Sequence, residues 1–591
     1  TGRALRDLML LLAPFQITPT AATKIYDHFG ARSVDILRDN PFELCQVSGF
    51  GFKRVDAIMR KNNWPLNSPM RIRGAVFAAL ESAKGDGGHL YLEAEQLHKE
   101  AMSLLNSMIP VPQMRVKSDD LDAVIDDMLL QGKIINSNGN YYLVKAFAQE
   151  DETARSIARL LCRPVERVDV QDLLTRVRRQ LGVELSLRQT EAVHMVFRSD
   201  LSIITGSPGT GKTTVLKAVI EVFKLLKPSE KILLAAPTGR ASRRMAESTG
   251  VDNASTLHSL LGLYGEDGGF RKGEEDMLDA GLIIVDESSM MDMWLARKFF
   301  SRIGPDTKVL LVGDADQLQS VGAGDVFREL INCGLIPVTV LNEIFRQKKD
   351  SLIAYNAQKI NNNDTSFFYG NDFTVCKCAN QEEAAEHIRN IYLAQVKQYG
   401  VDRVQILSPF RSTGAASADQ LNEAIRELVN PQTEEADLKV DNHYFRIGDK
   451  VMQNRNSGKA SNGDIGFIRG FRHDERDGMR IAIQFSPTRV VEYSMEEMGH
   501  VELAYATTVH KAQGSEFDVV IFPLLRSHAR MLTRSLVYTA ITRAKAKVIL
   551  VGQIGMLYMA VHKDDTGKRN TQLGRRIALY VNTFKVQKRS A

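Results

Sequence analysis

The chain has 591 residues, of which 44% are hydrophobic and 25% charged, the composition of an ordinary soluble globular protein. This length exceeds what one hydrophobic core supports, so roughly three to five domains are expected. The net charge of +5 permits a polyanionic partner but does not require one.

Apolar runs and cysteines narrow the class of protein further. No apolar run approaches the ~18 residues of a membrane-spanning helix, so no membrane partner is expected. The run "LMLLLA" is too short for such a helix, and no cleavage pattern of a signal peptide follows it. The five scattered cysteines favour a reducing cytoplasm. Cys376 and Cys378 are close together, but no second Cys/His pair accompanies them, so alternating strand positions explain them better than a metal site.

Residues 1–65 are predicted to be helical, with two copies of a hairpin signal. The second copy, "VSGFGFKRVDAIM", fits the h-x-G-h-G-x-x-x-h pattern of a helix–hairpin–helix motif. There Gly49 and Gly51 would free backbone amides to meet a DNA phosphate. The first copy, "ITPTAATKIYDHFG", lacks both glycines, which weakens its claim to phosphate binding. A purely structural helical hairpin is the alternative for each copy.

Residues 66–148 carry helices followed by "LQGKIINSNGNYYL". Two short strands around Ser-Asn-Gly-Asn predict a β-hairpin after a helix, which looks like a winged-helix-like module. Residues 149–184 are expected to form a helical linker.

A phosphate-binding loop follows. The apolar run "LSIIT" predicts a buried strand, "GSPGTGKT" matches G-x-x-x-x-G-K-[ST], and "TTVLKAVIEVFKLL" predicts a helix. This order aims backbone N–H groups at phosphate. We expect Lys212 to reach the β- and γ-phosphates and Thr213 to ligate Mg²⁺. The loop residues expected to bind the nucleotide are Gly206, Pro208, Gly209, Thr210, Gly211, Lys212, Thr213 and Thr214.

Gln189 lies just upstream of this strand, in "LSLRQTEAV". Its amide has the paired donor and acceptor that the edge of adenine requires. A solvated helix residue is the plain interpretation of this glutamine taken alone.

Two further strands are predicted to end in acids. In "GLIIVDESSM", Asp286 and Glu287 follow an apolar run, at the strand end where open α/β sheets bind ligands. Asp286 can hold Mg²⁺, and Glu287 can polarise the attacking water. In "KVLLVGDADQLQSVGAGD", Asp314 and Gln317 follow the strand, where a polar group can sense the γ-phosphate or bridge to another domain.

These segments belong to an ordered series: "GSPGTGKT", "APTGRAS", "TLHSLLG", "DESSM", "GDADQLQSVGAG", "LNEIFRQ", "ATTVHKAQGSEFD" and "VYTAITRAK". Their order and wording resemble superfamily 1 helicases. "APTGRASRRM" and "TTVHKAQGSE" are similar to the RecD/TraA branch in particular. The resemblance covers roughly residues 185 to 555 and implies two RecA-like domains with ATP between them and single-stranded DNA across their top.

The resemblance also implies roles for single residues. Arg346 in "LNEIFRQ" and Arg543 in "AITRAK" would reach the γ-phosphate from the second domain, where an arginine fork stabilises developing charge. Gly514 and Glu516 resemble the motif that contacts the ribose. DNA phosphates would be met by side chains at loop ends, although both histidines among them could instead be packing residues. These DNA candidates are Thr238, His258, Thr508 and His510.

Two insertions follow the same resemblance. Short strands and Gly/Asn turns over residues 437–503 predict a small β-barrel, where the family has an SH3-like module. The polar stretch "LYGEDGGFRKGEEDMLDAG" predicts a short β-hairpin near residues 261–279, with Tyr264 and Phe270 beside its turn. RecD-like helicases carry a small pin there that meets the duplex junction. A disordered solvent loop is the alternative.

The front modules match the layout of the long RecD-like proteins that act without RecB and RecC. Such proteins have a further N-terminal domain, whereas this sequence begins at "TGRALRD", as a piece of a longer protein or as a short variant.

The sequence thus predicts a multidomain α/β fold of two RecA-like P-loop domains, with helix–hairpin–helix and winged-helix-like modules and an SH3-like insertion. The expected divisions are 1–65, 66–148, 149–184, 185–345 for the first RecA-like domain, 346–436 and 504–591 for the second, and 437–503 for the insertion.

The predicted function is that of an ATP-dependent DNA helicase that uses ATP and Mg²⁺. The resemblance implies 5′→3′ movement on single-stranded DNA and unwinding of duplexes in repair or recombination. Expected partners are single-stranded DNA and single/double-strand junctions, with contact to a single-strand-binding protein left open, and the chain is expected to be a monomer. The alternative is a DNA-stimulated ATPase that clamps or remodels without separating strands. The nucleophilic tyrosine and histidine cluster of a conjugative relaxase are not evident in the sequence.

Overall fold

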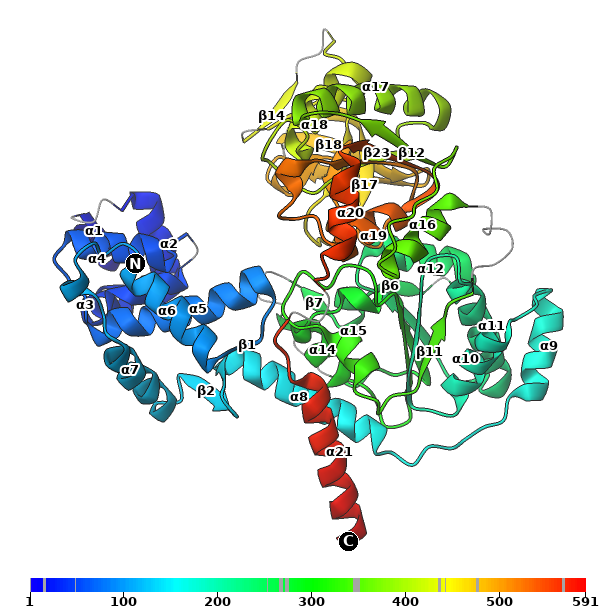
Figure 1. The fold of residues 1–591 in the computed structure, drawn as a ribbon, viewed down its shortest axis with the longest axis horizontal. Coiled ribbons are helices and arrows are strands. Elements are labelled where there is room, and N and C mark those ends of the chain that lie inside the picture. Colours follow the sequence, from blue (N-terminus) through cyan, green and yellow to red (C-terminus); the bar gives the residue numbers. More distant parts are fainter. Residues whose placement is uncertain are drawn as a thin grey trace. The chain divides into compact units, whose positions relative to one another are not determined.

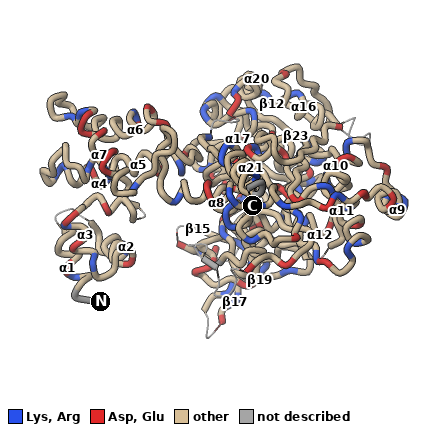
Figure 2. The backbone as a smooth tube through the Cα atoms, turned by 90° about the horizontal axis from the view of Figure 1, so that it is seen from below, with Lys and Arg blue, Asp and Glu red and all other residues tan. Residues whose placement is uncertain are grey.

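The computed structural model describes residues 2–13, 17–47, 49–251, 253–264, 269–270, 276–343, 351–433, 437–441, 443–474, 478–565 and 569–590. The chain forms two compact units. Unit 1 runs through Thr153 and includes Gly322–Gly324 and Arg569–Leu573, and unit 2 holds the rest (Figure 1). Figure 2 shows Lys and Arg interspersed with Asp and Glu along both units, in keeping with the small net charge.

Unit 1 begins with a helical module whose apolar side chains form its core. Leu8, Ile25, Phe50 and Val55 are fully or almost fully buried there. Asn40 caps the short 3₁₀ segment Pro41–Gln46, which precedes helix α4. The helices are α1 (Gly2–Leu12), α2 (Pro19–Phe29), α3 (Ser33–Asp39), α4 (Phe52–Lys61) and α5 (Pro69–Gly87).

The second part of unit 1 is a small α/β module with a β-hairpin. Strand β2 (Ile134–Ser137) pairs antiparallel with β3 (Asn140–Leu143), and the turn residues Asn138 and Gly139 have φ of 57° and 83°. Two successive positive φ values are those of a type I′ turn, which the Asn-Gly pair favours. A third strand, β1 (Tyr91–Glu93), joins on the other side of β3. The helices of this module are α6 (Ala94–Asn106) and α7 (Ser118–Leu130), and α8 (Val144–Leu161) follows it.

Unit 2 contains a six-stranded parallel sheet in the order β11-β4-β10-β9-β5-β6. Its strands are almost continuously apolar because helices cover both faces. The strands are β4 (Leu201–Gly206), β5 (Ile232–Ala236), β6 (Ala254–Thr256), β9 (Leu282–Val285), β10 (Lys308–Gly313) and β11 (Val338–Leu341). The helices are α9 (Gln171–Leu181), α10 (Leu187–Phe197), α11 (Lys212–Leu226), α12 (Gly239–Thr249), α13 (Leu257–Leu260), α14 (Met293–Phe300) and α15 (Val326–Asn332).

A second parallel sheet in unit 2 has the order β12-β23-β22-β13-β21. It has a separate apolar core on each face. Its strands are β12 (Phe373–Lys377), β13 (Val404–Ser408), β21 (Ala506–Thr508), β22 (Phe517–Leu524) and β23 (Ala544–Gly552). Its helices are α16 (Leu352–Asn361), α17 (Gln381–Tyr399), α18 (Ala418–Val429), α19 (Arg534–Thr542) and α20 (Ile554–His562), and α21 (Leu573–Ser590) ends the chain.

An antiparallel β module lies between α18 and β21. It has a five-stranded sheet, β19-β18-β17-β16-β20, and a separate hairpin of β14 and β15, around one apolar core. Along β17 and β18, buried side chains alternate with half-buried ones, which accounts for a core on one face. The strands are β14 (Leu438–Val440), β15 (His443–Phe445), β16 (Lys450–Gln453), β17 (Ile465–Asp474), β18 (Gly478–Ser486), β19 (Arg489–Ser494) and β20 (Val501–Leu503).

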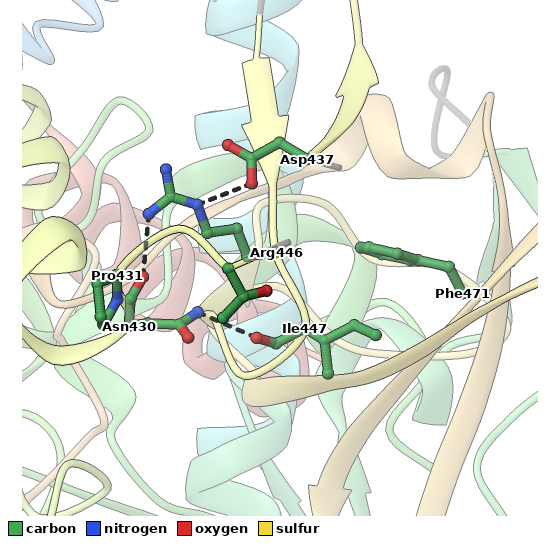
Figure 3. A pocket seen from close by; sticks show the side chains of 7 residues that line it. Asn430, Pro431, Asp437, Arg446, Ile447 and Phe471 are labelled. Carbon is green, nitrogen blue, oxygen red and sulfur yellow. Dashed lines mark hydrogen bonds and ion pairs between the residues drawn. The ribbon is translucent and has the colours of Figure 1, made fainter. Parts of the chain in front are cut away.

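Arg446 holds this module against the end of helix α18. Its guanidinium donates to Asp437 Oδ1 at 2.8 Å and to the Asn430 carbonyl at 2.9 Å, in a small pocket beside Phe471 (Figure 3). It also reaches Glu427 of α18 at 2.7 Å. Hydrogen bonds to Asp437 and then Glu427 raise the pKa of Arg446, so the group stays charged.

The predicted fold class is confirmed: helical front modules and parallel α/β sheets are joined by a small β module. Within the described ranges, no helix combines the length and apolar character that a membrane crossing needs.

Candidate nucleotide and DNA site

The loop between β4 and α11 has the backbone geometry of a phosphate cradle. Gly209 and Gly211 have φ of 88° and 82°, and Gly211 is the N-cap of the 15-residue helix α11. A Cβ at Gly206 would lie 2.6 Å from the Leu341 carbonyl oxygen, so only glycine fits there. Lys212 donates to the Gly206 carbonyl. The amides of the loop and of the first helical turn therefore converge at one helix N-terminus, where an anion is favoured.

The remaining loop residues lie in the same cradle. Pro208 is in the loop itself, and the Thr210 hydroxyl donates to the Ser207 carbonyl at 2.7 Å. Thr213 and Thr214 are in the first turn of α11.

Asp286 and Glu287 directly follow β9, the strand next to β5 and β10. Asp286 Oδ1 accepts from the Glu287 amide at 2.8 Å. Glu287 is 9% exposed and has a φ of 51°, a left-handed conformation that costs free energy in a residue other than glycine. Burial raises the pKa of Asp286, Glu287 adds to the rise, and Arg244 and Lys212 oppose it. Two carboxylates are thus held close together beside the phosphate cradle, where a cation would relieve their repulsion.

Asp314 connects the first sheet to the second. Its side chain is 1% exposed and accepts from the Tyr538 hydroxyl of α19 at 2.7 Å and from Gln317 Nε2 at 3.3 Å. Burial raises the pKa of Asp314. The Leu318 amide also donates to Thr539 Oγ1 at 2.8 Å. Of the two predicted roles of this segment, the structure shows the bridge between the two sheets.

Arg543 approaches the same carboxylates from the second sheet. It follows α19, is 2% exposed and donates from Nη1 to the Ser515 carbonyl at 3.2 Å. The same Nη1 atom lies 4.0 Å from Glu287 Oε1. A buried guanidinium from one sheet therefore faces the acid at the end of a strand in the other. Arg346, its predicted counterpart, lies outside the described residues.

Glu516 and Gly514 lie where β21 leads into β22. Glu516 Oε1 is 2.7 Å from Arg244 Nη1, and Oε2 is 3.4 Å from Lys545 Nζ. Burial alone would raise the pKa of Glu516, but Arg244, Arg543 and Lys545 outweigh it and lower the pKa. Glu516 is thus engaged by arginines, and the ribose contact stays a prediction.

Gln189 is buried at the start of α10 rather than solvated. Its Oε1 accepts from the Ser186 amide at 3.0 Å, and its Nε2 donates to the Thr210 carbonyl at 3.3 Å. The amide therefore ties the start of α10 to the phosphate cradle, and the adenine contact stays a prediction.

Two arginines on α12 were not singled out from the sequence. Arg244 reaches Glu516, and Arg240 donates from Nη2 to the Glu516 carbonyl at 2.7 Å and lies over the Phe517 ring at 4.7 Å. The signal was present as the spacing R-x-x-R-R in "GRASRR", which puts Arg240 and Arg244 on one helical face.

Three of the four candidate DNA residues lie at or just after the ends of β5 and β21, and their contact with DNA stays a prediction. Thr238 follows β5 and caps α12 through the Ala241 amide, while Thr508 ends β21 and accepts from the Lys511 amide at 3.4 Å, with His510 between them in that turn. A Cβ at Gly514 would lie 2.7 Å from Thr238 Oγ1, so the loops after β5 and β21 adjoin.

His258 is half-buried beside Trp294, with ring centroids 6.0 Å apart. Burial lowers the pKa of His258, so the ring is neutral at pH 7. It can donate one hydrogen bond to a phosphate, but it does not bring a positive charge. Trp294 was not predicted, and its place on α14, distant in sequence, gave no local signal.

In the helix–hairpin–helix segment, the two glycines differ. Gly49 has a φ of 92°, whereas Gly51 has an ordinary φ of −62° as N-cap of α4. A Cβ at Gly51 would meet no atom of the described protein within 4 Å. The backbone therefore requires glycine at position 49, and a requirement at position 51 would come from a bound phosphate.

The predicted pin region contains two short paired strands. β7 (Leu263–Tyr264) pairs antiparallel with β8 (Gly269–Phe270), with Tyr264 opposite Gly269. The intervening residues 265–268 lie outside the described residues.

The comparisons with known proteins agree with this geometry. Family models match at residues 1–91 (ATP-dependent RecD2 DNA helicase HHH domain), 189–323 (AAA domain), 421–485 (ATP-dependent RecD-like DNA helicase SH3 domain) and 503–551 (UvrD-like helicase C-terminal domain).

Proteins of similar sequence point to the same family. The ATP-dependent RecD2 DNA helicase of Deinococcus radiodurans is 31% identical over 584 residues, which is 97% of this chain and 78% of that protein. The RecD subunit of the RecBCD enzyme of Mycolicibacterium smegmatis is 28% identical over 64% of this chain and 72% of its own. Among solved structures, Bacteroides Pif1 bound to single-stranded DNA has 18% identity and a TM-score of 0.39, covering 62% of this chain and 92% of that one. With its phosphate cradle, paired acids and RecD2-type modules, the chain belongs to the RecD-like ATP-dependent DNA helicases.

Proposed function

We propose that this helicase moves 5′→3′ along single-stranded DNA as a monomer and parts duplexes at the β7–β8 hairpin, in DNA repair or recombination. The observation that supports coupling of hydrolysis to movement is the approach of Arg543 to Glu287, which joins the second sheet to the acid beside the phosphate cradle, and the direction is proposed from the resemblance to RecD-like helicases. An arginine delivered from another element makes hydrolysis depend on how the two sheets are arranged. Hydrolysis then drives translocation because each cycle changes that arrangement.

The roles of the side chains follow from their positions. Lys212 and the amides at the start of α11 hold the β- and γ-phosphates. Glu287 orients and polarises the attacking water, and Arg543 stabilises the charge that develops on the transferred phosphoryl group. Gln317 senses the γ-phosphate. Its amide donates to Asp314, which also accepts from Tyr538 of α19, so a change at Gln317 reaches α19.

Mg²⁺ fits the oxygen donors beside the cradle. The Thr213 hydroxyl and the Asp286 carboxylate would hold it, since both oxygens lie beside the cradle, at the first turn of α11 and directly after β9. When bound, the ion neutralises phosphate charge.

DNA would lie over the adjoining loops after β5 and β21. Hydroxyls of Thr238 and Thr508 sit at the carboxyl ends of parallel strands, one from each sheet. Because each sheet would contact DNA phosphates, a change in the arrangement of the two sheets would move one set of DNA contacts relative to the other. His258 of α13 and His510 of the turn after β21 add contacts without sequence specificity.

Strand displacement with tailed duplexes tests the proposal. The protein should unwind a duplex with a 5′ single-stranded tail, and should do so only with ATP and Mg²⁺. Unwinding confined to 3′-tailed duplexes would reverse the proposed direction. DNA-stimulated ATP hydrolysis with no displacement on either substrate would favour the alternative, an ATPase that clamps or remodels DNA.

A further inference from the structure

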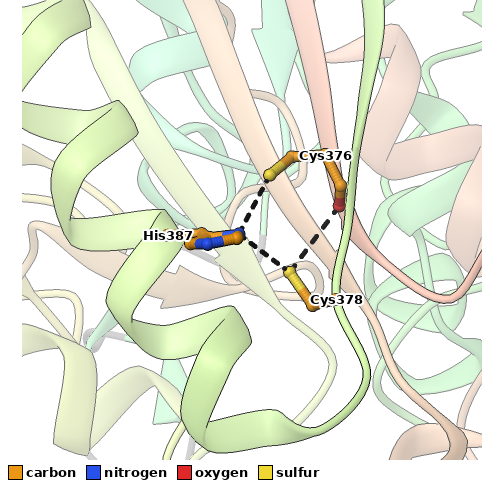
Figure 4. A group of neighbouring side chains, drawn as sticks. All are labelled: Cys376, Cys378 and His387. Atoms are coloured by element: carbon orange, nitrogen blue, oxygen red, sulfur yellow. Dashed lines mark hydrogen bonds between the residues drawn. The ribbon is translucent and has the colours of Figure 1, made fainter.

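Two cysteines and a histidine converge at one edge of the second parallel sheet. Cys376 lies in β12 and Cys378 directly follows its last residue, and both sulfurs face the same histidine. His387 comes from α17, and its Nδ1 lies 3.1 Å from Cys376 Sγ and 3.2 Å from Cys378 Sγ (Figure 4). All three ligand atoms lie within 4.8 Å of one another. Cys378 is 6% exposed, and the other two are half-buried.

The sequence analysis favoured plain strand positions for the cysteine pair, and the structure adds a third possible ligand beside it. The alternating positions on β12 were predicted, but the histidine that completes the group was not. His387 is nine residues beyond Cys378 and reaches the sulfurs only because α17 packs back on the strand.

The donor set is that of a zinc site. Two thiolates and one imidazole are preferred ligands of Zn²⁺, and three protein ligands leave a fourth tetrahedral position for water. In a tetrahedral site with the usual bond lengths, sulfur and nitrogen ligands lie about 3.6 Å apart. The observed separations would therefore have to widen by only about half an ångström to admit the ion.

Hydrogen bonds around the cluster hold its backbone in place. The Cys378 amide donates to the Gly552 carbonyl at 3.1 Å, and Gln553 Nε2 donates to the Ala379 carbonyl at 2.7 Å. On the helix side, Asn380 caps α17, and the Glu383 carboxylate accepts from the Ala379 amide at 2.7 Å. The strand end and the helix start are thus positioned before any ion binds, which reduces the cost of organising the ligands.

The Glu383 carboxylate adds a negative charge at the start of α17. Glu383 lies one helical turn before His387 on α17, and its carboxylate accepts from the Ala379 amide, directly after Cys378, so a negative charge stands near that end of the cluster. A nearby negative charge favours a cation over a neutral pair of thiols.

We propose that Cys376, Cys378 and His387 bind one Zn²⁺ ion, with water as the fourth ligand, and that the ion fastens α17 to the edge strand β12. The plain alternative is a pair of S–H···N hydrogen bonds within a packed cluster. In the zinc site both sulfurs are deprotonated and bound to the metal, whereas in the alternative they keep their protons. Bound metal and its thiolate absorption distinguish the two states.

The test uses the whole chain, purified under reducing conditions with Mg²⁺ present to fill oxygen-ligand sites. We expect one equivalent of zinc by mass spectrometry after incubation with equimolar zinc and a weak competing chelator. Replacement by Co²⁺ should give a thiolate-to-cobalt charge-transfer band and the d–d bands of tetrahedral cobalt. Cobalt held by oxygen ligands gives no thiolate band, so the spectrum separates this site from Thr213 and Asp286.

Variants locate the ion. Cys376→Ser and His387→Ala should each reduce bound zinc at least tenfold and abolish the cobalt–thiolate band. The matched control is Cys333→Ser, which removes a half-buried free cysteine elsewhere and should leave both readouts unchanged. Far-UV circular dichroism and ATP hydrolysis confirm that each variant is folded. If a variant does not fold, the wild-type chain decides, because removal of zinc by a strong chelator should lower its Tm by several degrees.

Less than a tenth of an equivalent of zinc, with no cobalt–thiolate band, would overturn the proposal. Binding that persists in Cys376→Ser and His387→Ala would also overturn it, since the ion would then lie elsewhere. A full equivalent that is lost in both variants and kept in Cys333→Ser would establish the site.

Discussion

Arg543 Nη1 lies 4.0 Å from Glu287 Oε1, although the two residues belong to different parallel sheets. Both side chains are almost fully buried, so solvent screens their interaction little. The arginine is held by the Ser515 carbonyl, and the acid is held in a left-handed backbone conformation. The pair puts a guanidinium and a carboxylate side by side, which is the arrangement that the proposed hydrolysis needs.

Arg543→Ala should slow ATP turnover by about 10²-fold or more, with little loss of ATP affinity. The reason is that the charge which Arg543 meets grows mainly in the transition state. Steady-state kcat and the Kd of a fluorescent ATP analogue measure the two effects separately. Arg543→Lys, which keeps the charge but loses the planar fork, should recover only part of the rate. A parallel drop in ATP affinity would make Arg543 a ground-state binder instead.

Glu287→Gln should keep ATP binding and slow hydrolysis by ~10²–10⁴-fold, since it removes the general base but keeps the shape. The substitution leaves the left-handed φ of 51° in place, so changes in stability should be small. Single-turnover hydrolysis measures the effect. Lys212→Ala is the comparison: it should abolish hydrolysis through lost phosphate contacts while single-stranded DNA binding persists. Substantial hydrolysis by either variant would place the catalytic centre elsewhere.

The sequence predicted the backbone of the phosphate cradle, which is local in the chain, while the roles of its residues stay predictions. The strand, glycine loop and helix around Lys212 form one continuous segment, and Asp286 follows its strand directly, so periodicity and spacing were sufficient. The two short β-hairpins were also predicted, because their turn residues are adjacent in the chain. The resemblance to RecD-like helicases added a prediction of the order of the modules along the chain.

What the sequence did not give arises from contacts between distant segments. Arg244 and Glu516 are 2.7 Å apart in space but come from different sheets. His387 joins the cysteine pair only through the packing of α17 on β12. The different conformations of Gly49 and Gly51 depend on how the helices around them pack, which a glycine pattern cannot distinguish.

Gly51→Val tests whether the front module binds DNA. Because a Cβ at this position meets no protein atom within 4 Å and φ is ordinary, the module should stay folded. The added side chain would stand where a phosphate approaches, so affinity for duplexes or junctions should fall severalfold. ATP hydrolysis stimulated by single-stranded DNA should not change.

Gly85→Val is the matched control, since its Cβ would also meet open space, on α5. Fluorescence anisotropy with a forked duplex measures affinity for all three proteins. Equal affinities would show that the hairpin is purely structural. Gly49→Val differs from both, because a φ of 92° strains any other residue, and it should lower the Tm.

The buried imidazole of His528 should make the free energy of unfolding depend on pH. Its side chain is 1% exposed, packs edge-on against Phe410 at 5.2 Å, and burial lowers its pKa to about 4. The unfolded chain binds a proton near pH 6.5, whereas the folded chain resists it down to about pH 4. Stability should therefore fall as the pH drops through this window, by up to ~3 kcal/mol from this residue. Urea unfolding of wild type and His528→Asn at several pH values measures it, and equal acid sensitivity would contradict the assignment.

The last prediction concerns how the strands part. β7 and β8 pair just after the short helix α13, which carries His258, a predicted DNA contact, so a short hairpin stands beside the proposed DNA path. Replacing residues 264–270 by a short Gly-Ser link should leave ATP hydrolysis stimulated by single-stranded DNA intact, because the nucleotide site lies on other segments. It should abolish or sharply reduce unwinding of a 5′-tailed duplex, because translocation would no longer meet a wedge.

Two comparisons make this prediction specific. Translocation of the hairpin variant, followed by displacement of streptavidin from a biotinylated single strand, should match that of the wild type, since movement itself does not need a wedge. A loss of translocation would instead mean that the hairpin supports the DNA path. Full unwinding by the variant would remove the wedge role, because strand separation would then follow from translocation alone.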